Sequence, residues 1–290
     1  MTASLLRKVI ALACALVNAQ ALAIDLLPND AVAPPPDLSF ATVFYQNLKY
    51  NDWYVNNQKS ISNPSMNIDL GGVRLARSYN VGSYPGITYV QVSAGGAQST
   101  GSAALSGNDS GLTDTAIATA IWPYANHETR SYFGLAGYVF LPTGSYDKTR
   151  PINLGENRYK ADLQIGYQTQ FTANLAGMLA FDTMWFGAND QANSKNDRLT
   201  QKPLYTTQLG PIYRLNRIFT LGANYLYIVG GEPSVNGQAQ NRMVQIQRYY
   251  ATLLAHLPVG RIAVQYGNDI ETRNGFQESR RFQVRFTHVF

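Results

Sequence analysis

The chain of 290 residues is rich in aromatic residues (12%) and poor in charged ones (14%), with 19 tyrosines and 24 glycines. Its formal net charge of +5 gives no reason to expect a nucleic-acid partner, and its single cysteine, Cys14, excludes an internal disulfide framework and a cysteine-based metal site. This composition is unusual for a soluble enzyme and typical of a membrane β-barrel with aromatic girdles, although a secreted β-sandwich is an alternative.

The first 23 residues have the parts of a secretory signal peptide. Arg7 and Lys8 precede an apolar run at residues 9–17, and Ala21-Leu22-Ala23 fits the small-x-small cleavage rule. The apolar run is too short to cross about 30 Å of hydrocarbon, which disfavours a membrane anchor. We therefore predict a signal peptide at residues 1–23 and a secreted mature chain that begins at Ile24.

Residues 24–37 contain four prolines, which indicates an extended N-terminal lead-in. From residue 38 onward, apolar and polar residues alternate with a period of two, most cleanly at 158–171. The apolar phase flips at Gly71-Gly72, which predicts a β-bulge there. The alternation predicts strands at 38–49, 66–79, 87–93, 112–122, 131–141, 158–171, 175–186, 204–213, 219–229, 243–257, 261–270 and 278–290.

The connections between these strands alternate in length. Short turns are expected at 123–129, 172–174, 214–217 and 258–260, and long polar loops at 94–110, 142–157, 187–203, 230–242 and 271–277. This alternation is typical of bacterial outer-membrane barrels, whose turns are periplasmic and whose loops are extracellular. The predicted fold class is therefore all-β, with residues 38–290 forming a single domain, a 12-stranded antiparallel up-and-down transmembrane β-barrel.

The chain ends on an alternating segment whose apolar residues include Phe286 and Phe290. Hydrocarbon offers no hydrogen bonds to a backbone, so a sheet in a membrane must close on itself. We expect the last strand to pair with the first, with its apolar side facing outer-membrane lipid. A terminal phenylalanine after such alternation resembles the signal that barrel-assembly machinery recognises, which makes that machinery an expected partner through Phe290.

The polar phase of the predicted strands identifies side chains that should line the lumen. Among these side chains the basic residues outnumber the acidic ones, so the lumen would attract anions or carboxylated aromatic compounds. Alternatively, the charges pair across strands and only hydrate the interior; Arg281 and Asp269 should then be close across the last hairpin. The candidate lumen-lining residues are Arg158, Lys160, Asp162, Gln164, Asp182, Arg261, Asp269, Arg281 and Arg285.

No catalytic constellation, cofactor or metal site is expected. The three histidines, His127, His256 and His288, lie near predicted short turns or the chain end without a Ser/Asp partner at a suitable spacing. G-x-S-x-G and H-E-x-x-H are both missing. Trp122, Trp185 and the tyrosines are more consistent with aromatic girdles at the membrane interfaces than with a cofactor site.

The most specific stretch is the predicted loop at 142–157 with its flanking residues, since loops of this length usually have a role. Two roles are considered for this loop: a structured flap over or into the pore, and a rigid surface loop. The distinctive residues are Pro142, Thr143, Gly144, Tyr146, Asp147, Arg150, Asn153, Gly155 and Asn157.

With Gly111-Leu112 and Asp114 upstream, this stretch resembles the meta-pathway phenol-degradation family of outer-membrane proteins. The close match covers residues 111–171, and Tyr159 stands where the family usually has tryptophan. The resemblance implies a transporter-like β-barrel and does not identify the compound that is transported.

Together these patterns predict a channel of the bacterial outer membrane. It would take up small, aromatic or hydrophobic solutes by diffusion through a lumen of intermediate width, since eight strands give a filled interior and sixteen to eighteen an open one. The alternative is a structural or surface-interaction barrel with a plugged lumen and partner-binding loops. An envelope hydrolase is the less favoured third interpretation.

Overall fold

The structure is a computed structural model. It describes residues 24–103 and 107–290, except for the side chains of residues 61 and 62. The predicted signal peptide lies outside the described residues. Within these residues, no helix has the length and apolar character needed to span a membrane.

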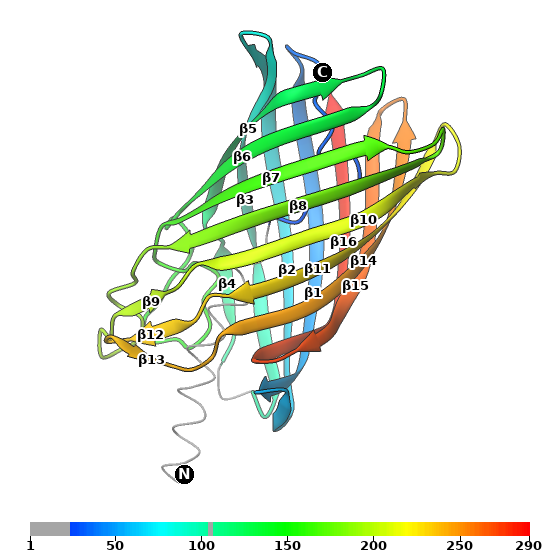
Figure 1. Cartoon of the computed structure of the whole chain (residues 1–290). Helices are drawn as coiled ribbons and strands as arrows, with labels where there is room; N and C mark the ends of the chain where they lie inside the picture. The colour runs from blue at the N-terminus through cyan, green and yellow to red at the C-terminus, as the bar shows by residue number, and fades with distance from the viewer. Residues whose placement is uncertain (1–23, 104–106) are drawn as a thin grey trace.

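The chain forms an antiparallel β-barrel (Figure 1). The main sheet has 13 strands, of which the short β4 (Asp109–Leu112) only extends the pairing along β3, and the β2–β3 pairing closes the remaining twelve into a cylinder. The fold-class prediction is confirmed. The barrel strands are β1 (Ser39–Val55), β2 (Gln58–Val81), β3 (Tyr84–Gly101), β5 (Thr115–Asn126), β6 (Ser131–Leu141), β7 (Lys160–Gln170), β8 (Leu175–Phe186), β10 (Leu204–Arg214), β11 (Phe219–Gly230), β14 (Val244–Leu257), β15 (Gly260–Thr272) and β16 (Gly275–Val289).

The first and last strands seal the barrel. β1 pairs with β16 from Phe40 opposite Val289 to Tyr54 opposite Gly275. Beyond the ladder, Ser39 and Phe290 exchange two backbone hydrogen bonds of 2.9 Å. The terminal phenylalanine therefore belongs to the seam, in agreement with the expected pairing of the two end strands.

We call the two ends of the barrel the turn end and the loop end. All the long loops lie at the loop end, together with two-residue turns at 56–57 and 273–274. The turn end has connections at 82–83, 127–130, 171–174, 215–218 and 258–259. The loop end carries a small sheet of β9 (Leu199–Gln201), β12 (Pro233–Val235) and β13 (Gln238–Ala239), which is opposite the C-terminus in Figure 1.

The alternating residues divide between two environments. In β7, Leu163 and Ile165 are 61% and 45% exposed on the outer surface, whereas Asp162 and Gln164 are buried inside. A sheet with polar residues inside and exposed apolar residues outside is the arrangement expected when lipid surrounds the barrel.

Several details of the strand and loop prediction are wrong. β3 continues into the expected loop at 94–110, and β15 and β16 meet in a two-residue turn at 273–274 where a long loop was expected at 271–277. β1 and β2 are longer than expected and meet in a tight hairpin at Asn56 and Asn57, both of which have positive φ. The β1–β2 register also runs through Gly71-Gly72 without a shift, so no bulge lies there. The apolar phase flips because Ile68 packs inside the barrel at the loop end, whereas Val73 faces outward.

Candidate functional site: the barrel lumen

In the N-terminal segment, residues 24–38, the part from residue 24 to residue 34 lies inside the barrel, whereas residues 35–37 are exposed. The Leu27 side chain is buried against Leu254 and Ala263. The Leu26 backbone accepts a hydrogen bond of 2.7 Å from Gln208 Nε2 and donates one of 3.0 Å to Gln208 Oε1. The sequence pattern indicated an extended lead-in but did not indicate that it lies inside the barrel. In this position the segment narrows the lumen.

Trp122 helps to hold this segment. Its indole nitrogen donates a hydrogen bond of 2.8 Å to the Ala31 carbonyl oxygen, and its side chain is only 5% exposed. The assignment of Trp122 to an aromatic girdle was therefore wrong, because a buried indole N–H needs an acceptor that lipid cannot supply. Trp185, at 42% exposed, does lie on the outer surface.

Asp30 joins the N-terminal segment to two of the predicted lumen residues. Its carboxylate oxygens lie 2.9 Å from Arg261 Nη2 and 3.0 Å from Arg285 Nη1. Burial acts to raise the pKa of Asp30, but the charges of Arg285, Arg261 and Arg74 outweigh it and leave the pKa below its ordinary value. One carboxylate of the segment thus shares the field of three arginines.

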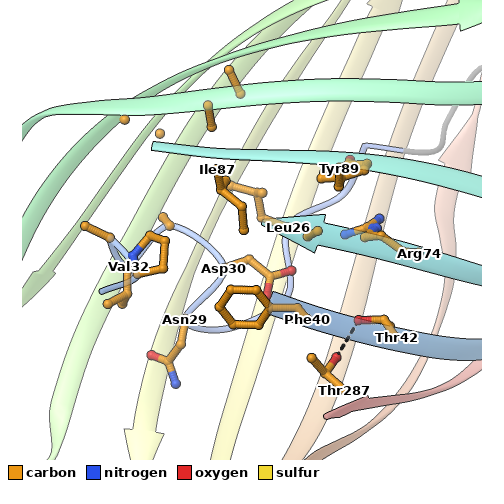
Figure 2. Close-up of a pocket in the computed structure, with 18 of the residues that line it drawn as sticks. Leu26, Asn29, Asp30, Val32, Phe40, Thr42, Arg74, Ile87, Tyr89 and Thr287 are labelled. Carbon is orange, nitrogen blue, oxygen red and sulfur yellow. Dashed lines mark hydrogen bonds between the residues drawn. The ribbon is translucent and has the colours of Figure 1, made fainter. Parts of the chain in front are cut away.

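A cavity of about 660 Å³ lies between this segment and the barrel wall (Figure 2). Arg74 stacks 4.1 Å above the Tyr89 ring and donates hydrogen bonds to Gln91. Figure 2 shows Asp30 beside Phe40, with Arg74 and Tyr89 on the neighbouring strands. The cavity therefore combines a mainly apolar and aromatic wall with guanidinium groups; its lining includes Phe40, Ile87, Tyr89, Trp122, Leu135, Tyr138, Arg74, Arg261 and Arg285.

A second cavity of about 430 Å³ lies towards the turn end and shares Asn29, Val32 and His256 with the first. Its wall is more basic, with three arginines near the turns: Arg130, Arg214 and Arg217. The N-terminal segment is therefore flanked by two hollow spaces, and both present positive charge to a solute.

At the loop end, the loop between β6 and β7 enters the barrel. Leu154 is fully buried and Ile152 is 4% exposed, and both belong to a cluster with residues of β1, β2, β3 and β16. This cluster contains Leu48, Tyr50, Trp53, Met66, Ile68, Ala97, Ala103 and Phe276. Of the two roles considered for the loop, the geometry matches the flap folded into the pore.

Two carboxylates fix the backbone of this loop: Asp109, the first residue of β4, and Asp114, two residues after β4. Asp109 accepts hydrogen bonds from Leu154 N at 2.8 Å and from Arg150 Nη1 at 3.1 Å. Asp114 accepts from Gly144 N and Glu156 N, each at 3.1 Å. Ionised carboxylates are strong acceptors for backbone N–H groups, so the two aspartates hold both sides of the loop.

The two motif glycines allow the loop to fold back on itself. A Cβ atom at Gly144 would lie 2.6 Å from Gly155 Cα, and one at Gly155 would lie 2.6 Å from the Gly144 carbonyl carbon. Real Cβ contacts are never so short, so both positions require glycine. This contact explains why the two glycines accompany the motif.

The other motif residues bond within the loop or to its neighbour. Thr143 bonds to Thr115, and Asn153 accepts from Asp147 N at 2.7 Å. Tyr146 Oη donates to the Gln191 carbonyl oxygen, and Asn189 donates to Tyr146 and accepts from Asn157. Pro142 begins the loop directly after β6. The motif thus ties two loops together.

Glu156 is buried between two predicted lumen residues. It accepts hydrogen bonds from Arg158 at 2.6 Å and from Lys160, and all three side chains are at most 4% exposed. Burial acts to raise the pKa of Glu156, but Lys160 and Arg158 outweigh it, so its pKa lies below the ordinary value. The two cations are therefore compensated inside the structure.

A further charge network joins β14, β15 and β16. Arg248 pairs with Asp269, and Arg281 pairs with Glu278 at 2.8 Å. Asp25 of the N-terminal segment lies 3.4 Å from Arg281. Arg281 and Asp269, which were expected to be close, both contact Glu278, but among the described residues the ion-pair partner of Asp269 is Arg248 on the other side of β15.

The remaining predicted lumen residues, Asp162, Gln164 and Asp182, are buried on the inner face of β7 and β8. All nine predicted side chains thus lie inside the barrel, but in four separate groups. The sequence analysis missed Arg74, Arg248 and Glu278, although each lies in or near a predicted strand. Strand phase could have found Arg248, since Tyr250 and Thr252 continue its buried face.

The basic excess expected from the sequence is largely offset. Asp25 and Asp30 come from the N-terminal segment and Glu156 from the loop, and all three pair with lumen cations. In the described part of the chain, no group of three or more His, Cys, Asp or Glu residues could hold a metal ion. The remaining positive potential is concentrated around the two cavities.

Comparison with known structures supports a channel. The chain matches the COG4313 outer membrane channel from Pseudomonas putida F1 with a TM-score of 0.89 and 27% identity, over 92% of this chain and 100% of the other. The β domain of the Bordetella autotransporter BrkA matches with a TM-score of 0.52 and 10% identity over 88% and 100%, which shows only a shared fold. These are outer-membrane barrels, which points to the bacterial outer membrane.

No curated protein sequence matches the chain. The model of the family described as "Putative MetA-pathway of phenol degradation" matches residues 54–286, well over half of the chain. The suspected resemblance is thereby confirmed, and the chain belongs to this family of outer-membrane β-barrel channels.

Proposed function

We propose that this protein is an outer-membrane channel that takes up small aromatic or hydrophobic solutes, with a preference for those that carry a carboxylate. The observation that carries the proposal is the 660 Å³ cavity, because its apolar and aromatic wall is combined with Arg74, Arg261 and Arg285. Apolar walls with a few polar anchors are typical of small-molecule sites, and guanidinium groups bind carboxylates in a bidentate manner.

Asp30 supports this preference. It is a carboxylate that already occupies the arginine cluster, so it shows which group the cluster accommodates. An incoming carboxylate would interact with Arg74, which donates to Gln91 and stacks on Tyr89, or would compete with Asp30 for its partners. The solute would then pass along the lumen by diffusion, without a cofactor or a covalent step.

The occupied lumen favours the alternative of a plugged barrel. The N-terminal segment and the β6–β7 loop both fill space that an open pore would need. A plugged barrel would use its loops to contact partners and would conduct no solute.

Planar-bilayer recordings discriminate between the two functions. We expect conductance steps that are reduced by benzoate and far less by benzyl alcohol, which has the same ring without the charge. Arg74→Gln should weaken the benzoate effect several-fold, whereas Arg77→Gln, an exposed residue on the same strand that pairs with Asp37, should not change it. Silent membranes would support the plug, and equal block by both compounds would refute the carboxylate preference.

A further inference from the structure

Two buried carboxylates on the lumen wall have no counter-ion among the described residues. Asp162 is 1% exposed and Asp182 is 8% exposed, and neither forms an ion pair. Both carboxylate oxygens of Asp162 are without a hydrogen-bond partner. The two carboxylates interact with each other, which adds repulsion to the cost of burial. A buried charge without compensation is strongly unfavourable, so this pair must either share a proton or have a cation beside it.

Ile24 contacts residues that neighbour this carboxylate pair. Gln164 Nε2 donates a hydrogen bond of 3.2 Å to the Ile24 carbonyl oxygen. Gln164 lies opposite Asp182 in the β7–β8 register and two residues from Asp162 on the same face. The Ile24 side chain packs in a cluster with Met184 and Tyr138, which are the residues directly opposite Asp162 on β8 and β6.

Backbone dimensions place the Ile24 nitrogen in the same region. The nitrogen of a residue is within about 4 Å of its own carbonyl oxygen, and that oxygen is held by Gln164. On the other side, Asp25 is fixed by Tyr250 at 2.9 Å and by Arg281. The backbone at residues 24–25 therefore cannot move far from the Asp162 wall.

The predicted signal-peptide cleavage would create the missing cation at this place. Hydrolysis of the Ala23–Ile24 peptide bond by water leaves a carboxylate on Ala23 and an α-amino group on Ile24. An α-amino group has an ordinary pKa of about 7.7–8.0 and is mostly protonated at neutral pH. A peptide nitrogen carries no charge, so only the cleaved chain can supply this ion.

We propose that the mature chain begins at Ile24 and that its α-ammonium group binds the Asp162–Asp182 carboxylate pair. Export processing would then complete the lumen wall, because the new ion pair anchors the N-terminal segment that borders both cavities. This inference does not depend on which solute the channel carries.

Mass spectrometry and amine labelling of the protein purified from outer membranes test the proposal. The intact mass should correspond to a chain that begins at Ile24. Reductive methylation of the folded protein over a range of pH, with quantification of the N-terminal peptide, gives the apparent pKa of the amine. We expect this pKa to be above the ordinary range, since burial alone would lower it. At neutral pH the amine should therefore react about 10-fold more slowly than in the denatured chain.

Asp162→Asn combined with Asp182→Asn should lower the apparent pKa of the amine and accelerate its labelling. The matched control is Asp190→Asn, which removes an exposed carboxylate from the β8–β10 loop. If the double variant does not fold, a glycine inserted between Ala23 and Ile24 serves instead, because it moves the amine by up to about 3.5 Å while keeping the carboxylates. A different N-terminal residue, or an amine pKa that is the same in wild type and variants, would overturn the proposal.

Discussion

At the scale of single residues, Glu156 has the largest expected effect on stability. It is the shared carboxylate of Arg158 and Lys160 in a site closed to solvent. Glu156→Gln leaves two buried cations with reduced compensation, and breaking buried pairs of this kind costs about 3–5 kcal/mol. We expect a lower temperature for the loss of heat-modifiable mobility on SDS gels, and a lower urea midpoint in detergent.

The control for this variant is Asp190→Asn. Asp190 pairs with Arg198, but both side chains are well exposed, and exposed pairs contribute only about 0–1 kcal/mol. A Glu156→Gln protein as stable as the Asp190→Asn protein would show that solvent reaches the Glu156 site.

Asp30 predicts how acid affects the N-terminal segment. Its pKa lies below the ordinary value of 3.8, so its ion pairs contribute stability above that pH and lose it as the pH falls through the lower native pKa. We expect the Asp30 contacts to persist at pH 4 and to be lost only in stronger acid, which single-channel conductance would detect as a larger step.

The Asp30→Asn variant provides the comparison for this pH series. Because it lacks the carboxylate at every pH, its conductance should already be high at neutral pH and should lack the acid-dependent increase. A wild-type transition above pH 4, or the same transition in both proteins, would contradict the role given to Asp30.

Strand phase predicted which side chains face inward, but not which of them pair. Arg281 and Asp269 were expected to meet because they belong to the last hairpin, yet Arg248 from β14 takes Asp269. Which charged side chains form ion pairs depends on how far each side chain extends across three neighbouring strands. It also depends on Asp25 and Glu156, which enter the lumen from segments without strand periodicity.

At the scale of elements, the β6–β7 loop behaves as part of the core. Leu154 is fully buried among lumen residues of four strands, and Leu→Ala changes at such sites cost about 2–5 kcal/mol. Leu154→Ala should therefore release the loop, which would raise its rate of proteolysis and increase the conductance.

Leu215→Ala is the matched control, since Leu215 is 49% exposed in a short turn. It should leave both proteolysis of residues 142–159 and conductance unchanged. If Leu154→Ala also leaves them unchanged, the loop does not restrict the pore.

The strands themselves were largely predictable, because apolar residues that face lipid alternate with polar residues that face the lumen along each barrel strand. The period-two alternation gave every barrel strand, and the short turns gave the direction of the hairpins. The prediction underestimated the lengths of β1 to β3, where the loop end of the lumen is apolar. There Ile68 and Leu70 pack inward near Leu154, so hydrophobicity no longer marks the outer face.

At the scale of the whole molecule, the outer surface must match hydrocarbon. Leu163 is 61% exposed on β7, and an arginine on the lipid face costs about 2–4 kcal/mol at mid-membrane but about 0–1 near the interfaces. Leu163→Arg should lower the yield of folded barrel in lipid vesicles, measured by the heat-modifiable band.

Val259→Arg is the matched control, because it also introduces an arginine at a residue that is 61% exposed. Val259 lies in the turn between β14 and β15 and not on a strand. It should fold like wild type. Equal losses for both variants would mean that the effect is one of net charge and not of lipid contact.

What fills the barrel was the least predictable property of the whole molecule. A period-two pattern specifies a wall with two faces, and it contains no information about segments that later occupy the interior. The proline-rich residues before β1 gave no periodic signal, although they provide Asp25 and Asp30 to the lumen charges.

The position of Ile24 has a practical consequence for handling the protein. A purification tag fused directly before this residue would have to be accommodated within the barrel, and one fused after Phe290 would adjoin the seam with Ser39. The hairpin tip at Asn236-Gly237 is a better insertion point, since no atom lies within 4 Å of the place where a Gly237 side chain would begin.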